Sequence, residues 1–137
     1  GERAPSVSAV VESIARTTGE RVSISGASAA NILGLSTQNP ARQIFWVSGR
    51  SRHLKLGAQE VELKHVPNWQ LRAPNNKAGH AFRALAYFGK SEVRSALMRI
   101  RSQLDDEERQ ELFGLRANAP IWMAKELSTL AAPAGSQ

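Results

Sequence analysis

The sequence contains no cysteine and no long apolar run, and each absence narrows the classes of protein that it can belong to. Without cysteine there are no disulfides, no cysteine nucleophile and no thiolate zinc site, which agrees with the cytoplasmic location that we expect. No window of roughly 18 apolar residues exists, so we expect no membrane-spanning helix. The first residues, Gly1 to Pro5, include neither an initiating Met nor the apolar region of a secretory signal. We therefore expect a piece of a longer protein.

The length and composition of the chain fit one globular domain. It has 137 residues, of which 42% are hydrophobic, and this is enough for a sizeable core. We expect the domain to cover residues 1–130. The last residues, 131–137, are predicted to be a flexible tail.

The net charge of +6 is concentrated in the middle of the chain. Between Gln38 and Lys90 there are nine lysines and arginines against two glutamates, whereas Ser91 to Leu112 has four against six acids. A positive field of this kind attracts nucleic acid or an acidic protein partner. Ordinary solubilising charge explains the same balance equally well, so the charge alone leaves both interpretations open.

Hydrophobic spacing and capping residues predict helices at the N-terminus and in the C-terminal half. The first helix carries apolar residues from Val7 to Ala15 at helical spacing and ends at Gly19. Ser25 is the predicted N-cap of a helix from Gly26 to Leu33. Two further helices have apolar faces that run from Ala78 to Phe88 and from Val93 to Leu104. The last two begin at Asp105, with Glu108 in a capping box, and at Pro120.

The central region is rich in strand-forming residues. Strands are predicted over Gln43 to Ser48, Arg52 to Leu56 and Gln59 to Val66, and Arg21 to Ile24 is a further short candidate. Gly57-Ala58 fits a two-residue type II′ turn. The resulting register pairs Lys55 with Glu60, Leu54 with Val61 and His53 with Glu62. The expected fold is α+β: a small antiparallel sheet, a three-strand meander, packed with about five helices.

Residues that could carry catalysis are few. His53, His65 and His80 lie on separate predicted elements without the spacing of a metal-ligand set. The tripeptide Glu62-Leu63-Lys64 occurs in strands of metal-dependent nucleases, but such sites also need an acidic ligand on a neighbouring strand, and no aspartate precedes Asp105. We expect a protein that is not an enzyme and needs no metal or cofactor. A degenerate nuclease-like enzyme is a minor alternative.

Basic side chains are the better candidates for a functional site. Lys55 is expected to pair with Glu60, which leaves a set of freer cations that we predict to gather on one side of the molecule and to bind a partner or nucleic acid. Trp46 and Trp69 could add stacking, although no helix-turn-helix is apparent. The candidate site residues are Arg42, Arg50, Arg52, Lys64, Arg72 and Lys77.

The run SGASAANILGLSTQNPA, from Ser25 to Ala41, resembles the signature of AbiEi-like antitoxins. Other pieces match in the same order, so the resemblance covers nearly the whole chain. These pieces lie within Pro5 to Arg16, Gly49 to Gly57, Glu62 to His65, Arg83 to Lys90 and Ala119 to Met123.

The resemblance implies the C-terminal antitoxin portion of a type IV toxin–antitoxin system. The partner would be a nucleotidyltransferase-like toxin, although proteins of this kind do not all contact their toxin directly. The implied full-length protein has an N-terminal winged helix that represses its own promoter, with the basic face of the antitoxin portion assisting DNA binding. No catalytic residues carry over. The alternative to an antitoxin domain is an accessory DNA- or RNA-binding module of a transcriptional regulator.

Overall fold

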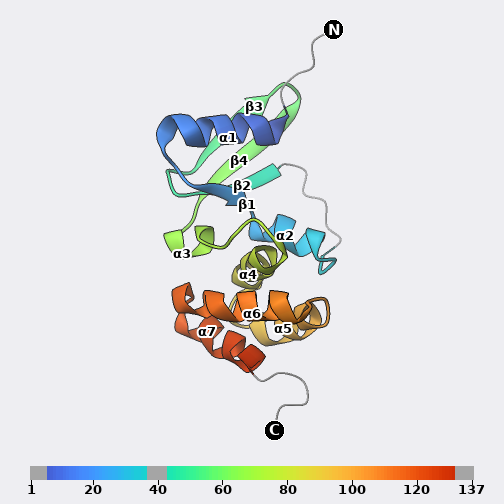
Figure 1. Cartoon of the computed structure of the whole chain (residues 1–137). Coiled ribbons are helices and arrows are strands. Elements are labelled where there is room, and N and C mark those ends of the chain that lie inside the picture. The colour runs from blue at the N-terminus through green and yellow to red at the C-terminus, as the bar shows by residue number, and fades with distance from the viewer. Residues whose placement is uncertain (1–5, 37–42, 132–137) are drawn as a thin grey trace. The chain divides into compact units, whose positions relative to one another are not determined.

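The computed structural model describes residues 6–36 and 43–131, which belong to two compact units (Figure 1). The first unit comprises Gly1–Ile24 and Asn39–Leu71, and the second comprises Ser25–Gln38 and Arg72–Gln137. Arg42 and nearly all of the predicted tail lie outside the described residues. The single domain expected over 1–130 stays a prediction.

The first unit contains a four-stranded sheet. Its elements are α1 (Val7–Thr18), β1 (Val22–Ile24), β2 (Gln43–Val47), β3 (Arg52–Leu56), β4 (Gln59–His65) and the one-turn helix α3 (Asn68–Leu71). The strand order is β1-β2-β4-β3. The outer pairs, β1 with β2 and β3 with β4, are antiparallel, and the central pair, β2 with β4, is parallel.

The β3–β4 hairpin confirms the predicted register. His53 lies opposite Glu62, Leu54 opposite Val61 and Lys55 opposite Glu60. Gly57 has a positive φ of 64°, as a type II′ turn with glycine in its first central position requires. No non-glycine residue among those described has a positive φ.

The predicted three-strand meander is wrong, because β2 pairs with β4 rather than with β3. The central strand β4 carries Val61 and Leu63, both 0% exposed, and such a strand needs a neighbour on each side. In β3 half-buried and exposed residues alternate, which suits an edge strand. The short candidate near Arg21 is real and forms β1, so the described sheet has four strands instead of three.

The core of this unit lies between α1 and one face of the sheet. Val11 of α1 packs with Phe45 and Val47 of β2 and with Val61 and Leu63 of β4. The helix has Ser6 as its N-cap, and it ends at the left-handed Gly19, the end that the sequence predicted. Figure 1 shows α1 lying across the sheet.

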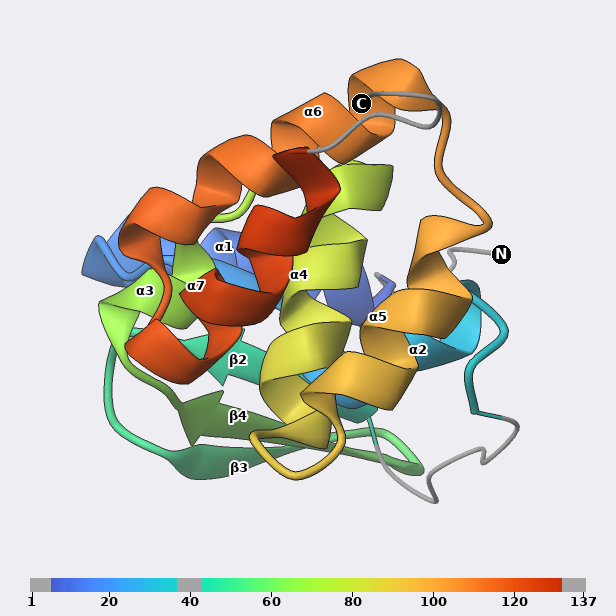
Figure 2. The ribbon, with the colours of Figure 1, turned by 90° about the horizontal axis from the view of Figure 1, so that it is seen from below.

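The second unit is helical. It consists of α2 (Gly26–Ile32), α4 (Lys77–Phe88), α5 (Val93–Arg101), α6 (Asp106–Gly114), α7 (Ile121–Leu127) and the 3-10 helices η1 (Leu115–Asn118) and η2 (Ser128–Ala131). The central helix α4 packs against α2, α5 and α6 (Figure 2). Helix α4 is therefore buried on more sides than the one apolar face that the sequence predicts, and even its Arg83 is buried.

Most helix ends of this unit are where the sequence places them. The hydroxyl of Ser25 accepts a hydrogen bond from the amide of Ser28, and Gly34 has a positive φ of 72°. Asp105 and Glu108 form the predicted capping box of α6. The residues Gly26, Ala29 and Ala30 are small and buried, which lets α2 lie close to α4. Much of the run on which the family resemblance depends thus forms α2.

The α+β class is confirmed, with seven α-helices in the described ranges where about five were expected. One of the additional helices, α3, makes a single turn shortly after β4, where no helix was predicted. No helix of the described chain has the length and apolarity to cross a membrane.

Candidate functional site

Two of the predicted cations are exposed on the sheet unit. Arg50 lies in the loop between β2 and β3, and Lys64 lies on β4. Both side chains can reach a partner, because neither belongs to the apolar face that α1 covers.

The prediction that Arg52 is a freer cation is wrong. Its guanidinium donates to both carboxylate oxygens of Glu20, over 3.2 Å and 2.7 Å, and to the carbonyl of Arg50 over 2.7 Å. Both side chains of the pair are mostly buried. Hydrogen bonds from Arg52, more than any other cause, hold the pKa of Glu20 below its ordinary value, whereas burial raises it. The guanidinium therefore joins the β2–β3 loop to the segment that follows α1.

Gly49 belongs to the same cluster. A Cβ at this position would lie 2.0 Å from Oε1 of Glu20, so only glycine lets the carboxylate approach so closely. On the other side of the loop, Nδ1 of His65 is 2.8 Å from the Gly49 carbonyl and 3.1 Å from that of Ser48. Both partners are acceptors, so this nitrogen carries the proton. The histidine is exposed, and its contacts hold the loop between β2 and β3.

The remaining predicted cations belong to the helical unit. Arg72 is exposed, and Lys77 is half-buried at the start of α4. Nζ of Lys77 donates to the carbonyl of Gln103 over 2.7 Å, just beyond the end of α5, where a helix carries partial negative charge. The side chain of Gln103 in turn donates to the carbonyl of Leu33 over 2.8 Å. Lys77 therefore helps to join α4 to the end of α5.

The six predicted residues thus divide between two units. Arg50, Arg52 and Lys64 belong to the sheet unit, Arg72 and Lys77 to the helical unit, and Arg42 lies outside the described residues. Because Arg52 is paired with Glu20, a single basic face formed by the other five stays a prediction.

Sequence reasoning missed the buried Arg83, which is 1% exposed. Its guanidinium donates to the carbonyls of Ala73 and Pro74, each over 2.9 Å, and so fixes the loop before α4. Its Nε, like Nδ1 of His80 one turn earlier, is buried with no hydrogen-bond partner among the described residues. Burial lowers the pKa of Arg83, and burial followed by the nearby Arg83 charge lowers the pKa of His80.

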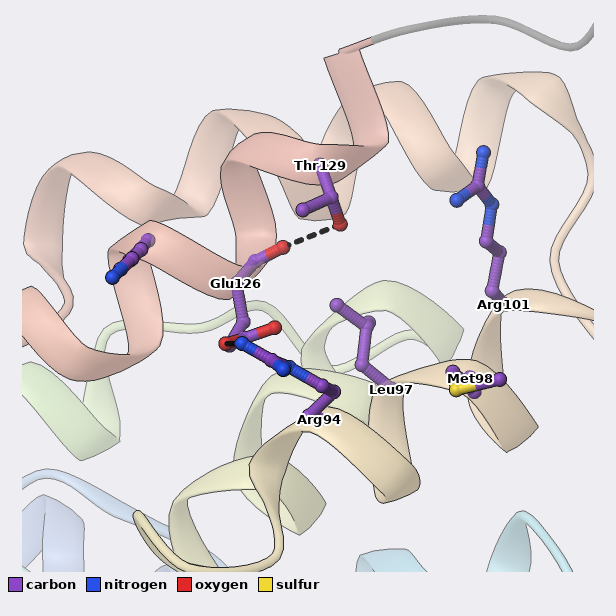
Figure 3. Close-up of a pocket in the computed structure, with 7 residues that line it drawn as sticks. Arg94, Leu97, Met98, Arg101, Glu126 and Thr129 are labelled. Atoms are coloured by element: carbon purple, nitrogen blue, oxygen red, sulfur yellow. Dashed lines mark hydrogen bonds and ion pairs between the residues drawn. The ribbon is translucent and has the colours of Figure 1, made fainter.

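The helical unit carries a groove of about 350 Å³ between α5 and α7. Figure 3 shows Arg94 of one helix approaching Glu126 of the other. Arg94 of α5 lies 3.4 Å from the carboxylate of Glu126 on α7. The hydroxyl of Thr129 donates to the backbone carbonyl of Glu126 over 2.7 Å. The lining residues are Arg94, Leu97, Met98, Arg101, Lys125, Glu126 and Thr129.

Two of the three cations in the groove, Arg94 and Arg101, lie in the segment from Ser91 to Leu112, where acids outnumber bases in the sequence. The acids of this segment cluster in the first turn of α6, where they favour the helix N-terminus. Arg94, Leu97, Met98 and Arg101 follow the i, i+3, i+4, i+7 spacing of one helix face. This helical spacing was the signal in the sequence that could have identified the groove-lining face of α5.

The geometry around Glu62 gives no support to the nuclease alternative. Glu62 faces His53 across the β3–β4 pair, and Lys64 follows it on the same side of β4. Nowhere in the described residues do three or more His, Cys, Asp or Glu side chains lie together as potential metal ligands.

Fold and groove together define an α+β protein whose helical unit presents a cationic, partly apolar surface. The chain belongs to DUF6088, a family of unknown function, whose model matches residues 1–112. The match ends within α6, so the α5 side of the groove lies inside it and the α7 side lies beyond it. Searches of curated proteins and of solved structures found no match.

Proposed function

We propose that the chain is a non-enzymatic antitoxin domain of a bacterial type IV toxin–antitoxin system. It acts in the cytoplasm, neutralises a nucleotidyltransferase-like toxin and supports repression of its own promoter through basic surface residues. The resemblance to AbiEi-like antitoxins supports this proposal over nearly the whole length of the chain.

The observation that carries the proposal is the groove between α5 and α7. Its exposed lining residues are Arg94, Met98, Lys125 and Thr129, which offer positive charge, a flexible thioether and a hydroxyl to a partner. The part of the family-like run that forms α2 has a structural role. Helix α2 packs against α4 and so helps to form the unit that presents the groove.

A growth-rescue experiment tests the proposal. The chain is co-expressed with the nucleotidyltransferase-like toxin encoded beside it, and colony formation is compared with cells that carry the toxin alone. Rescue is expected. Loss of growth despite soluble chain with a native circular dichroism spectrum contradicts the antitoxin role.

The second candidate function is an accessory DNA- or RNA-binding module. The exposed positions of Arg50, Lys64 and Arg72 favour it, because exposed cations can each contact a phosphate. This function predicts an affinity that falls steeply with salt.

A further inference from the structure

We infer that the groove between α5 and α7 binds an acidic amphipathic helix of a partner protein. This inference rests on the proposed function, because it names the kind of toxin segment that the antitoxin would hold. It assigns a role to Arg94, Met98 and Lys125, none of which belongs to the basic residues predicted from the sequence.

The chemistry of the lining residues fits such a helix. Arg94 and Arg101 lie on α5 and Lys125 lies on α7, so each side of the groove offers positive charge. Met98 is 72% exposed, which is unusual for so large an apolar side chain. A helix that carries an apolar stripe between carboxylates would bury the flexible thioether and place its negative charges against the cations.

The apolar surface continues beyond the groove along α7. Ile121 is 87% exposed and lies four residues before Lys125, so the two side chains share one face of α7. The nine residues of α5 span about 14 Å at 1.5 Å per residue. A partner helix of two to three turns therefore matches the length that the groove offers.

A protein segment suits the groove better than a nucleic acid does. None of the described lining residues is aromatic, so the groove lacks the side chains on which nucleobases stack.

Methionine-methyl NMR on the full chain tests the inference, because the chain has two methionines in contrasting places. Met98 is exposed in the groove, and Met123 is fully buried in the core. The probe is a synthetic 14-residue helical peptide with leucines along one face and glutamates on both sides of them. Two control peptides replace the glutamates by lysines or scramble the order so that no apolar face remains.

The acidic amphipathic peptide should move the Met98 methyl signal saturably and leave that of Met123 in place. The lysine peptide and the scrambled peptide should bind at least tenfold more weakly. A single-stranded oligonucleotide that moves the Met98 signal more strongly than the acidic peptide would assign the groove to nucleic acid instead. No response of Met98 to the acidic peptide overturns the inference.

A matched pair of charge reversals completes the test. Lys125→Glu, which acts in the groove, should weaken peptide binding at least tenfold. Arg99→Glu makes the same charge change at an exposed position of α5 outside the groove and should alter affinity less than twofold. Equal effects of the two variants overturn the inference, because the attraction would then be general. Peptide binding without growth rescue refutes the antitoxin role alone, and rescue without peptide binding refutes the groove alone.

Discussion

Replacing Gly79 by alanine should destabilise the helical unit, although the same change stabilises most helices. An added Cβ would lie 1.7 Å from the carbonyl oxygen of Pro74 and 2.7 Å from its carbonyl carbon. Both are backbone atoms, so no side-chain rotation can relieve the clash. The loop before α4 would have to move away from the helix.

The magnitude follows from what that movement breaks. The Pro74 carbonyl accepts a hydrogen bond from Nη2 of the buried Arg83, and hydrogen bonds to charged groups contribute about 1.5–3 kcal/mol. Displacing the packed loop costs a further ~1–3 kcal/mol. Against these costs, alanine gains roughly 0.5–1 kcal/mol over glycine within a helix. The expected net loss of unfolding free energy is about 2–5 kcal/mol.

Gly114→Ala is the matched control, because Gly114 ends α6 and nothing lies within 4 Å of its added Cβ. It should leave stability unchanged or raise it by up to about 1 kcal/mol. Urea unfolding followed by circular dichroism measures both variants against the original chain. A Gly79→Ala chain as stable as Gly114→Ala would refute the close approach of Pro74 to α4.

Three further predictions concern single side chains. Because its pKa is lowered in the folded chain, ionised Glu20 stabilises the fold above the ordinary pKa of 4.5, and this contribution is lost as the pH falls through the lower folded value. Urea unfolding from pH 7 to pH 3 should therefore show the advantage over Glu20→Gln shrinking in acid; a constant difference would contradict the pairing with Arg52. Asp105→Ala removes the capping box and should cost about 1 kcal/mol in the same assay, and no loss would show that the cap is dispensable. If the chain binds nucleic acid, Arg72→Gln should lower the log–log salt slope of binding by about one, and an unchanged slope would exclude a phosphate contact.

Local features of the fold were predictable from the sequence. The capping box at Asp105 and Glu108 involves residues three apart, and the hairpin turn at Gly57 sets the register of its strands. In both cases neighbouring residues contain the whole signal. The parallel pairing of β2 with β4 has no such signal, because it depends on which strand must be buried between two others.

The candidate site was predicted less well because its contacts join distant residues. Arg52 pairs with Glu20 from 32 positions away, and a count of charges along the segment treats it as free. Arg94 and Glu126 are also 32 positions apart, and the groove exists only once α5 and α7 lie together. The net charge of the segment from Ser91 to Leu112 also concealed where its charges lie. The acids cluster at the start of α6, whereas Arg94 and Arg101 lie on the groove face of α5.

The rate of nucleotide transfer by the purified toxin, measured as incorporation of labelled nucleotide with increasing amounts of the chain, tests neutralisation most directly. A saturable fall in rate is predicted, with Arg99→Glu as effective as the original chain and Lys125→Glu clearly weaker. An unchanged rate at a large excess of folded chain would contradict neutralisation by direct contact.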